Sequence, residues 1–448
     1  MDHRLLVFIA LVCAVLIPKW LTAQGWQNGN GPYMFPVNDL VPSQDGSSLY
    51  VCAGTNVPAR PLFSWDGIAW SGLVTFNGGN LWTLAEDADT LYVGGAFTLV
   101  DSLPYSMLVR RVNNQWFPTA SFNAGVTSVK VYGDTVLAVG SFSELNGQPC
   151  MGMAMAVNGV WECLADSDMT QNLIYDVIKH HDTLFVAGTI ELSPGPGRGI
   201  IYKTTGPWQQ LGTGFVGMNG IGKTLAVYHD QLYIGGSIYG YEGNVANGIA
   251  RWNGTSLEAV GQPTLYGVCG TINCPCDVYD MVVHDDKLFV SGRFGYVNGT
   301  PVTGVAYWDG LSWCPLGGGL LMPVRSLAFF QDTLFASTAQ LDGVQINGVA
   351  KYIADTTFAP CSTTDVVHAE GPIQLMLWPV PCNERLNLSG LPGRSLEVLV
   401  RDAMGRERAR HKVHGTEYEL DVRTLPAGAY TIEFQGSSPM TSRRFVKE

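Results

Sequence analysis

Four histidines occur at the same point of three successive sequence repeats, and imidazole nitrogens are common metal ligands. Each falls at a tight turn predicted between the first two strands of a repeat: His180, His181, His229 and His284. A shared metal site is one interpretation. The other is that these are solvent-exposed turn residues, since turns of neighbouring repeats are expected to lie many ångströms apart. We adopt the second interpretation and predict no metal and no other cofactor.

Ten cysteines form a second group with possible chemistry. Cys150 and Cys163 bracket the predicted third strand of one repeat and are a candidate disulfide. Three more lie within one insertion, at Cys269, Cys274 and Cys276. A Cys-x-Cys with no following histidine or second pair is poor zinc spacing, so disulfides are favoured over metal. The pairing of these cysteines stays open.

The sequence holds no convincing catalytic constellation. The segment Ser64 to Trp70 is one residue short of a sialidase-type Asp box and its glycine is misplaced, so it is interpreted as a hairpin turn. The tyrosines, histidines and cysteine that a galactose-oxidase copper site needs are not grouped by any motif. The paired glycines precede neither Lys-Ser/Thr nor a helix and are not phosphate loops. No catalytic residue is predicted.

Aromatic residues gather in the loops that follow the second strands of the repeats. We predict that they form a candidate ligand face comprising Tyr105, Tyr239, Tyr241, Tyr266 and Tyr296. Exposed aromatic side chains on a loop-bearing face suit binding to a glycan or a protein. The alternative is that these tyrosines cover the hydrophobic edges of the sheets.

One short sequence motif, called the phrase below, recurs seven times along the chain. Its spacing indicates which strands and turns position the histidines, cysteines and tyrosines described above. Its cleanest copy is Asp-Thr-Leu-Tyr-Val-Gly-Gly-Ala-Phe at residues 89–97. The other copies start at Ser47, Asp134, Asp182, Asp230, Asp286 and Asp332. The intervals are 42, 45, 48, 48, 56 and 46 residues. Periods of about 40 to 50 residues are typical of β-propellers, and each unit is interpreted as four antiparallel strands.

The repeats resemble kelch-type propeller repeats over roughly residues 26–358. The shared marks are a double glycine closing the second strand, an aromatic third strand and a tryptophan beginning the fourth, as in Gly235-Gly236, Trp252 and Trp313. No tryptophan-containing fourth strand follows residues 348–352. We therefore predict that the segment around Trp26 supplies it, closing a ring of seven blades over residues 24–358 and protecting an open edge.

The N-terminus and the charge balance indicate an exported acidic protein. Residues 1–23 fit a secretory signal peptide, with a basic start, an apolar run and cleavage near Ala23. The run is too short for a membrane anchor, and no transmembrane segment is predicted. Residues 24–373 hold 13 Lys and Arg against 28 Asp and Glu. This excess of negative charge disfavours nucleic acid as a partner.

The composition changes after a linker at residues 359–373. Residues 374–448 hold 11 Lys and Arg against 9 Asp and Glu, and their alternating strands predict a small immunoglobulin-like β-sandwich. This region resembles the type A C-terminal sorting domain of the type IX secretion system of Bacteroidetes-like bacteria. The matching positions are Pro379, Pro381, Asn383, Gly405, Arg406, Gly428, Tyr430 and Lys447. Trp378 and Val380 depart from the Tyr-Pro-Asn-Pro opening of that family.

The sequence thus predicts an all-β protein, a seven-bladed propeller followed by a small sandwich. The resemblance implies export by the type IX machinery, removal of the sorting domain by its sortase, and release or attachment at the outer-membrane surface. The preferred function is a secreted or surface-attached module that binds protein or polysaccharide. The alternative is a secreted glycan-active hydrolase, lyase or oxidase with its site at the propeller mouth. Paired carboxylates there would favour a glycosidase.

Overall fold

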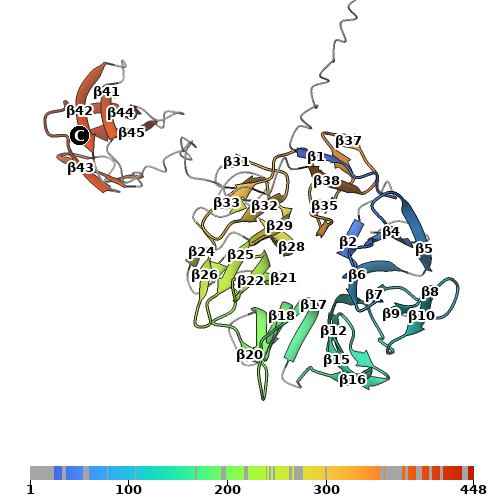
Figure 1. Ribbon diagram of the computed structural model, residues 1–448. Coiled ribbons are helices and arrows are strands. Elements are labelled where there is room, and N and C mark those ends of the chain that lie inside the picture. Colours follow the sequence, from blue (N-terminus) through green and yellow to red (C-terminus); the bar gives the residue numbers. More distant parts are fainter. Residues whose placement is uncertain are drawn as a thin grey trace, which may run out of the picture. The chain divides into compact units, whose positions relative to one another are not determined.

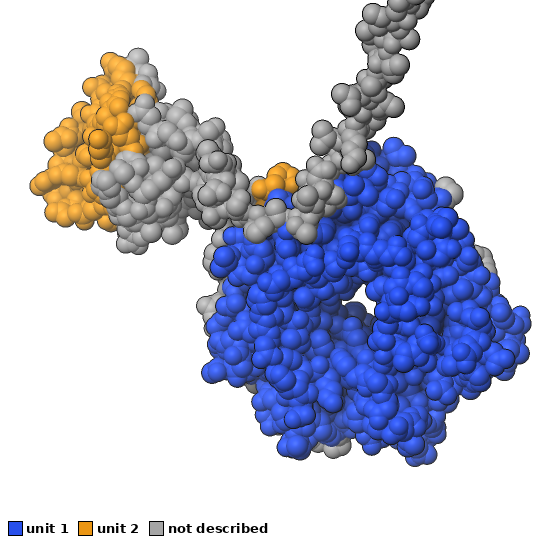
Figure 2. Space-filling view, in the orientation of Figure 1, with its two compact units in different colours: residues 1–295, 302–360 blue, residues 296–301, 361–448 orange. Residues whose placement is uncertain are grey.

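The computed structural model divides into two compact units, unit 1 (residues 1–295 and 302–360) and unit 2 (residues 361–448 and 296–301; Figure 2). The predicted signal peptide and the linker at 359–373 lie outside the described residues. No helix in the described ranges has the length and apolar character needed to cross a bilayer. The structure describes residues 25–32, 37–53, 60–77, 79–105, 107–166, 169–192, 198–215, 220–238, 240–241, 244–245, 248–261, 265–266, 276–297, 300–353, 358, 376–378, 382–389, 396–402, 406–413, 417–435 and 442–447.

Unit 1 is an all-β propeller whose antiparallel sheets surround a central axis (Figure 1). Within the described residues it has seven sheets of four or five strands. In chain order they contain β2 (Val37–Pro42), β3 (Leu49–Ala53), β4 (Arg60–Trp65), β5 (Trp70–Asn77) and β8 (Leu99–Val100); β6 (Asn80–Asp87), β7 (Thr90–Ala96), β9 (Leu108–Val112) and β10 (Gln115–Pro118); β11 (Val126–Tyr132), β12 (Thr135–Gly140), β15 (Met153–Val157) and β16 (Val160–Cys163); β17 (Met169–His180), β18 (Thr183–Leu192), β19 (Arg198–Lys203) and β20 (Gln209–Gln210); β21 (Ile221–Tyr228), β22 (Gln231–Ser237), β25 (Ile249–Trp252) and β26 (Leu257–Ala259); β28 (Asp277–His284), β29 (Lys287–Arg293), β32 (Val305–Trp308) and β33 (Trp313–Pro315); and β34 (Leu327–Phe330), β35 (Thr333–Ser337), β38 (Val349–Ile353) and β1 (Gly25–Asn28).

Short strands lie between the second and third strands of several sheets. They form two-residue ladders, β13 (Glu144–Leu145) with β14 (Gln148–Pro149), β23 (Gly240–Tyr241) with β24 (Asn244–Val245), β30 (Tyr296–Val297) with β31 (Thr300–Pro301), and β36 (Gln340–Leu341) with β37 (Val344–Gln345). Strand β27 (Leu265–Tyr266) lies between the fifth and sixth sheets in the chain.

The recurring phrase is explained by the turn between the first two strands. Asp230 and Asp286 both have positive φ, at 58° and 57°, and so does the residue before each of them. Aspartate and asparagine tolerate this left-handed conformation better than most residues, which favours Asp at this point of the turn. The second glycine of the phrase is required for a different reason, which is the close approach of the adjacent strand. A Cβ on Gly236 would collide with the carbonyl oxygen of Ile221 in the adjacent first strand.

The N-terminal segment supplies the fourth strand of the last sheet, as predicted. Strand β1 pairs antiparallel with β38, and Trp26 lies opposite Tyr352. The Trp26 indole N–H donates to the carbonyl oxygen of Leu316 in the preceding sheet at 2.8 Å. Fourth-strand tryptophans elsewhere do the same: Trp208 donates to Leu164 and Trp313 to Val260, each at 2.7 Å. Trp26 therefore repeats a contact that joins neighbouring sheets elsewhere in unit 1.

Unit 2 contains two antiparallel sheets around one hydrophobic core. One has the order β39-β40-β43 and the other β42-β41-β44-β45. Side chains from both sheets share the core, including Leu386, Leu420, Val398 and Phe445. The strands are β39 (Met376–Trp378), β40 (Arg385–Ser389), β41 (Leu396–Asp402), β42 (Glu407–Val413), β43 (Glu417–Asp421), β44 (Gly428–Gln435) and β45 (Ser442–Lys447).

Candidate functional site: the axis of unit 1

The first strands of the sheets line the axis of unit 1 and touch one another in order around it. Six of them, β2, β6, β11, β17, β21 and β28, carry a β-bulge at the same point. Figure 2 shows an opening at the middle of this unit. The residue directly after each bulge is small and polar or acidic. We call these the latch residues: Asp39, Thr83, Ser128, Asp176, Thr224, Asp280 and, at the corresponding point before β34, Ser326.

The latch aspartates join neighbouring sheets. Asp176 accepts hydrogen bonds from the backbone N–H of Val177 and from the Ser128 hydroxyl on Oδ1, at 2.9 and 2.8 Å. Its Oδ2 accepts the N–H of Leu225 in the next sheet, at 2.8 Å. Both carboxylate oxygens are therefore engaged, and one of them reaches across the junction between sheets.

The two other latch aspartates repeat this arrangement. Asp39 accepts the N–H of Leu84 in the next sheet at 2.7 Å and the Ser326 hydroxyl of the preceding sheet at 3.0 Å. Asp280 accepts the N–H of Leu327 in the next sheet at 2.7 Å. These contacts satisfy backbone groups that burial would otherwise leave unpaired. The axis carboxylates are thus built into the fold.

Two latch aspartates, Asp39 and Asp280, are half-buried at the axis and have raised pKa values. Burial and the Asp280 carboxylate raise the pKa of Asp39 to about 7. Burial likewise raises the pKa of Asp280. Lys130 lies with Nζ 3.5 Å from Asp176 Oδ1, and this carboxylate is the main cause of its raised pKa. Lys130 thereby compensates part of the negative charge at the axis.

The bulged residues of these six strands, together with Arg325 at the corresponding point before β34, form a second set one position before the latch residues. We call this set the bulge ring: Asn38, Trp82, Thr127, Tyr175, Lys223, Tyr279 and Arg325. Six of them are half-buried and Arg325 is exposed. Bulges re-aim side chains and are frequent beside functional sites. Three aromatic rings and two cations thus belong to one girdle around the axis.

The bulge ring is most densely connected between the fifth and sixth sheets. Lys223 Nζ lies 4.6 Å from the centre of the Tyr279 ring and 3.1 Å from Asp277 Oδ1. Arg293 approaches Asp277 Oδ2 at 3.0 Å. Burial alone would raise the pKa of Asp277, but the Ser237 hydroxyl and the two cations outweigh it and lower that pKa. Lys223 and Arg293 thus share one carboxylate, and Arg325 adds a further cation to the bulge ring. The ring itself contains two cations and no carboxylate, next to the acidic latch residues.

The predicted tyrosine face is described only in part. Tyr239 and the side chains of Tyr241 and Tyr266 lie outside the described residues. Tyr105 packs against the core of the first two sheets, and its hydroxyl donates to the Trp116 carbonyl oxygen at 3.4 Å. This packing matches the alternative interpretation, in which tyrosines cover sheet edges. Tyr296 is half-buried in β30. The sequence interpretation missed Tyr175 and Tyr279 of the bulge ring.

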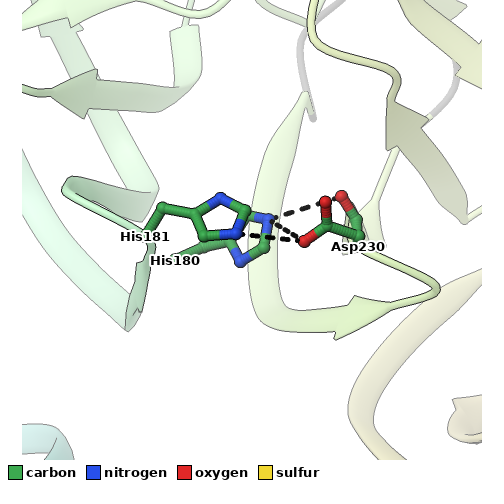
Figure 3. A group of neighbouring side chains, drawn as sticks. All are labelled: His180, His181 and Asp230. Carbon is green, nitrogen blue, oxygen red and sulfur yellow. Dashed lines mark hydrogen bonds and ion pairs between the residues drawn. The ribbon is translucent and has the colours of Figure 1, made fainter.

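The turn histidines are not brought together as one set, but the expected wide separation of neighbouring turns was wrong. The reason is that the histidine side chains of one turn approach the aspartate in the corresponding turn of the next sheet. His229 Nε2 lies 2.5 Å from Asp286 Oδ1. His180 and His181 are adjacent, with ring centres 4.1 Å apart, and both approach Asp230 (Figure 3). The sequence interpretation overlooked these aspartates.

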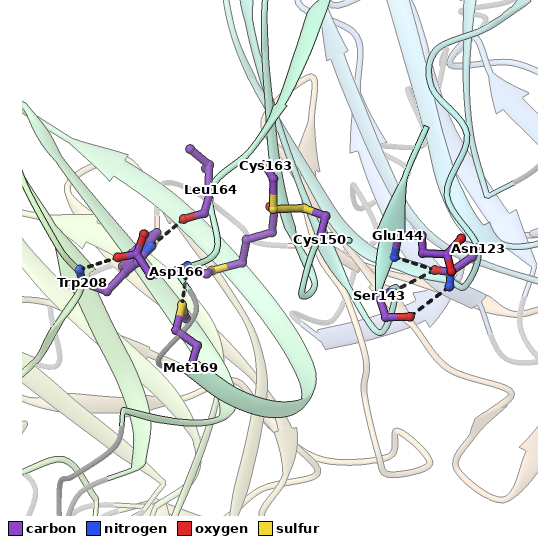
Figure 4. The surroundings of a disulfide bond; sticks show 10 residues. Asn123, Ser143, Glu144, Cys150, Cys163, Leu164, Asp166, Met169 and Trp208 are labelled. Atoms are coloured by element: carbon purple, nitrogen blue, oxygen red, sulfur yellow. Dashed lines mark hydrogen bonds between the residues drawn. A yellow bond between two sulfur atoms is a disulfide. The ribbon is translucent and has the colours of Figure 1, made fainter. Parts of the chain in front are cut away.

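The disulfide between Cys150 and Cys163 is present and ties the loop after β14 to the end of β16 (Figure 4). Cys314 is also disulfide-bonded. Cys276 is a buried free thiol, which corrects the expectation that it would be bridged, and burial raises its pKa. Cys269 and Cys274 lie outside the described residues.

The predicted sorting residues that are described lie in unit 2. Tyr430 is buried, donates its hydroxyl to the Pro426 carbonyl oxygen at 2.7 Å and stacks on Phe445. Arg406 binds Asp402 at 3.0 Å. Gly428 lies opposite Lys447, and Asn383 is exposed. Pro379, Pro381 and Gly405 lie outside the described residues.

Comparisons with known proteins identify the C-terminal region. Residues 376–448 match the family described as secretion system C-terminal sorting domain. No curated protein matches the chain.

Solved structures similar to the chain include PorZ, a surface component of the type IX secretion system of Porphyromonas gingivalis. The identity is 15%, the TM-score is 0.44, and 92% of this chain and 59% of that chain are covered. The extracellular domain of BT4673 from B. thetaiotaomicron has 12% identity, a TM-score of 0.44, and coverage of 92% and 56%. The Swd1 β-propeller domain of Myceliophteria thermophila has 10% identity, a TM-score of 0.44, and coverage of 73% and 99%. The chain thus spans less than two thirds of the first two proteins.

The sorting domain implies that the chain interacts with the type IX secretion machinery and is exported by it. The protein is therefore secreted or displayed at the cell surface.

Proposed function

We propose that this protein is an exported binding module that captures polysaccharide with acidic groups through the bulge ring. In this proposal residues 1–23 are a signal peptide removed near Ala23. Residues 24–358 form a seven-bladed, kelch-like propeller and residues 359–373 are a linker. Residues 374–448 are an immunoglobulin-like sorting domain removed by the sortase of the type IX system, which leaves the propeller released or attached at the outer-membrane surface.

The composition of the bulge ring is the observation that supports this ligand class. Aromatic faces stack on sugar rings, and the bulge ring contains Trp82, Tyr175 and Tyr279, the last of which already faces Lys223. Lys223 and Arg325 supply charge-assisted donors that suit carboxylate or sulfate groups. Unit 1 carries a large excess of acidic residues, so the two cations of the bulge ring are the groups at the axis that an acidic polymer would contact. An acidic protein segment remains the second ligand class.

The state of the axis carboxylates favours binding over glycoside hydrolysis. Hydrolysis needs one carboxyl to protonate a leaving group and another to act on the sugar or on water. In Asp39 and in Asp176, one oxygen instead accepts a backbone N–H of the same strand and the other accepts a backbone N–H of the next sheet. Withdrawing either oxygen for catalysis would leave a buried N–H unpaired.

A binding experiment tests the proposal directly. The purified chain is titrated with uronate-containing, sulfated and neutral polysaccharides, with binding read by affinity electrophoresis and calorimetry. Arg325→Ala and Tyr175→Ala are expected to weaken binding of an acidic polymer by about tenfold each, through loss of a charge-assisted contact and of a stacking face. Lys287→Ala is the matched control, because Lys287 is a cation of the β28–β29 turn and not of the bulge ring. Equal weakening by all three variants would contradict the proposed site.

Deletion of residues 374–448 tests the sorting part separately. The propeller is expected to stay in the periplasm, detected by cell fractionation and surface proteolysis. Surface display of the truncated chain would show that the sorting assignment is wrong, without bearing on polysaccharide binding.

A further inference from the structure

A compact group of metal-ligating atoms lies between the fourth and fifth sheets. His180 and His181 end the β17 side of the β17–β18 turn, and Asp230 belongs to the β21–β22 turn. The Nε2 atoms of both histidines lie 3.3 Å from the same oxygen, Asp230 Oδ1. One ligand atom from each residue lies within 4.8 Å of the others. Figure 3 shows both imidazole rings approaching the carboxylate.

These separations match the coordination geometry of zinc. Zinc binds imidazole nitrogen and carboxylate oxygen at about 2.0–2.2 Å, so the edge of its tetrahedron measures about 3.3–3.6 Å. Both nitrogen–oxygen separations already have this length. The two imidazole nitrogens lie within 4.8 Å of each other, so a rotation of the histidine side chains is what a cation bound by all three residues requires.

The other junctions of the same kind show what distinguishes this group. His229 has one partner, Asp286 Oδ1 at 2.5 Å, which is hydrogen-bonding distance. His284 lies 3.7 and 3.8 Å from Asp285 and Asp332, and its ring stacks on Phe329. Among the described residues, only the 180–181–230 group combines three such side chains with their ligand atoms in reach of one another.

We propose that His180, His181 and Asp230 bind one first-row divalent cation of the zinc class and so clip the fourth and fifth sheets together. Two imidazoles and one carboxylate form a borderline donor set suited to zinc rather than to calcium or magnesium. The side chain of His181 is 70% exposed and that of Asp230 is 74% exposed. Water can therefore enter and complete the coordination sphere, which leaves the cation an open position.

Two of the three proposed ligands lie at turn positions with a left-handed backbone conformation. His181 and Asp230 have φ values of 50° and 58°, in the left-handed region. Asparagine is among the residues best tolerated there. Replacing either ligand by asparagine therefore removes a metal-binding atom while keeping the turn, which allows a clean test.

The test is calorimetric titration of the chelator-treated full chain with Zn²⁺, supported by the absorption spectrum of bound Co²⁺. The wild type is expected to bind one Zn²⁺ per chain with a tetrahedral cobalt spectrum and a raised unfolding temperature. His181→Asn and Asp230→Asn are each expected to weaken Zn²⁺ binding by about tenfold or more. Removing a group that only supports a metal ligand already weakens binding by about tenfold or more, and removing the ligand itself is expected to cost at least as much.

His229→Asn is the matched control, because His229 occupies the position in the β21–β22 turn that His181 occupies in the β17–β18 turn, has a positive φ of 48°, and approaches Asp286 rather than Asp230. It is expected to bind Zn²⁺ as the wild type does. Thermal unfolding in chelator verifies that all three variants are folded. The proposal is overturned if the wild type takes up no Zn²⁺, if Asp230→Asn binds it unchanged, or if His229→Asn weakens it as much as His181→Asn does.

Discussion

Two contacts join the fourth and fifth sheets of unit 1, and they differ in almost every physical respect. Near the axis, Asp176 of β17 accepts the N–H of Leu225 and is only 5% exposed. At the turn, the exposed carboxylate of Asp230 approaches His180 and His181. Both are carboxylates that reach from one sheet to the next. Only the first one accepts a hydrogen bond from a buried backbone N–H group.

This difference shows where stability and adaptability reside in the propeller. A buried carboxylate with several donors is expensive to disturb, because its removal leaves those donors unpaired. An exposed ion pair exchanges freely with water and contributes little to folding. The axis contacts are therefore suited to holding the ring together, whereas the turn contacts are free to exchange a neighbour for a ligand.

The largest expected effect is that of Asp176→Ala. It leaves the Leu225 N–H and the Lys130 ammonium without their partner, at a cost of about 3 kcal/mol in the free energy of unfolding. Urea unfolding followed by tryptophan fluorescence measures this cost as a lower midpoint at unchanged slope. Asp182→Asn, an exposed residue of the same hairpin, is the control. A loss of stability no greater than that of the control would show that the axis contact is not a latch.

The next effect is a pH dependence specific to Asp39. Its carboxyl titrates near 4 when unfolded and near 7 when folded. Between these values the native state binds the extra proton, so its stabilising contribution is complete below about pH 4 and is lost as pH rises through 7. The free energy of unfolding of the wild type minus that of Asp39→Asn is therefore expected to decrease between pH 5 and pH 8. The expected decrease is on the order of 2 kcal/mol. Denaturant unfolding of both proteins across this range measures it, and a constant difference would refute the raised pKa.

A smaller effect is expected at the outer rim, where Trp26 closes the ring. Trp26→Phe keeps an aromatic ring against Tyr352 but removes the hydrogen bond to the Leu316 carbonyl oxygen. The expected cost is about 1 kcal/mol. Trp208→Phe provides the comparison, since it removes the same contact within the continuous chain. A much larger loss for Trp26 than for Trp208 would indicate that closure depends on more than this bond.

The sequence predicts the propeller, its closure by Trp26 and the sorting domain, because these depend on local patterns. Turn residues, strands with alternating polarity and the recurring tryptophan can each be recognised in the sequence of a single repeat. The axis contacts were missed for a specific reason. In six of the repeats the latch residue lies six positions before the aspartate that begins the recurring phrase, and the bulge-ring residue lies seven positions before it. These latch residues are Thr83, Ser128, Asp176, Thr224, Asp280 and Ser326. The residue types differ from copy to copy, so only a comparison at fixed offset shows that the position is always polar.

The contact of Asp230 with His180 and His181 has no comparable signal in the amino-acid sequence. The residues are separated by about one repeat, and their approach depends on how far two turns project from neighbouring sheets. Aspartate at this point of the turn is explained by backbone conformation alone, so its presence in the sequence carries no information about a ligand. The three-dimensional arrangement was needed to find the group.

The smallest expected effect completes the comparison at the shared junction. In chelator, Asp230→Asn removes the carboxylate next to His180 and His181 while keeping a residue that tolerates the turn conformation. Because the group is exposed, the loss in free energy of unfolding is expected to stay below about 1 kcal/mol, well under that of Asp176→Ala. Urea unfolding of both variants side by side measures the ratio. A loss at Asp230 equal to that at Asp176 would mean that the turn contact is itself structural, and the two carboxylates would then differ in position but not in role.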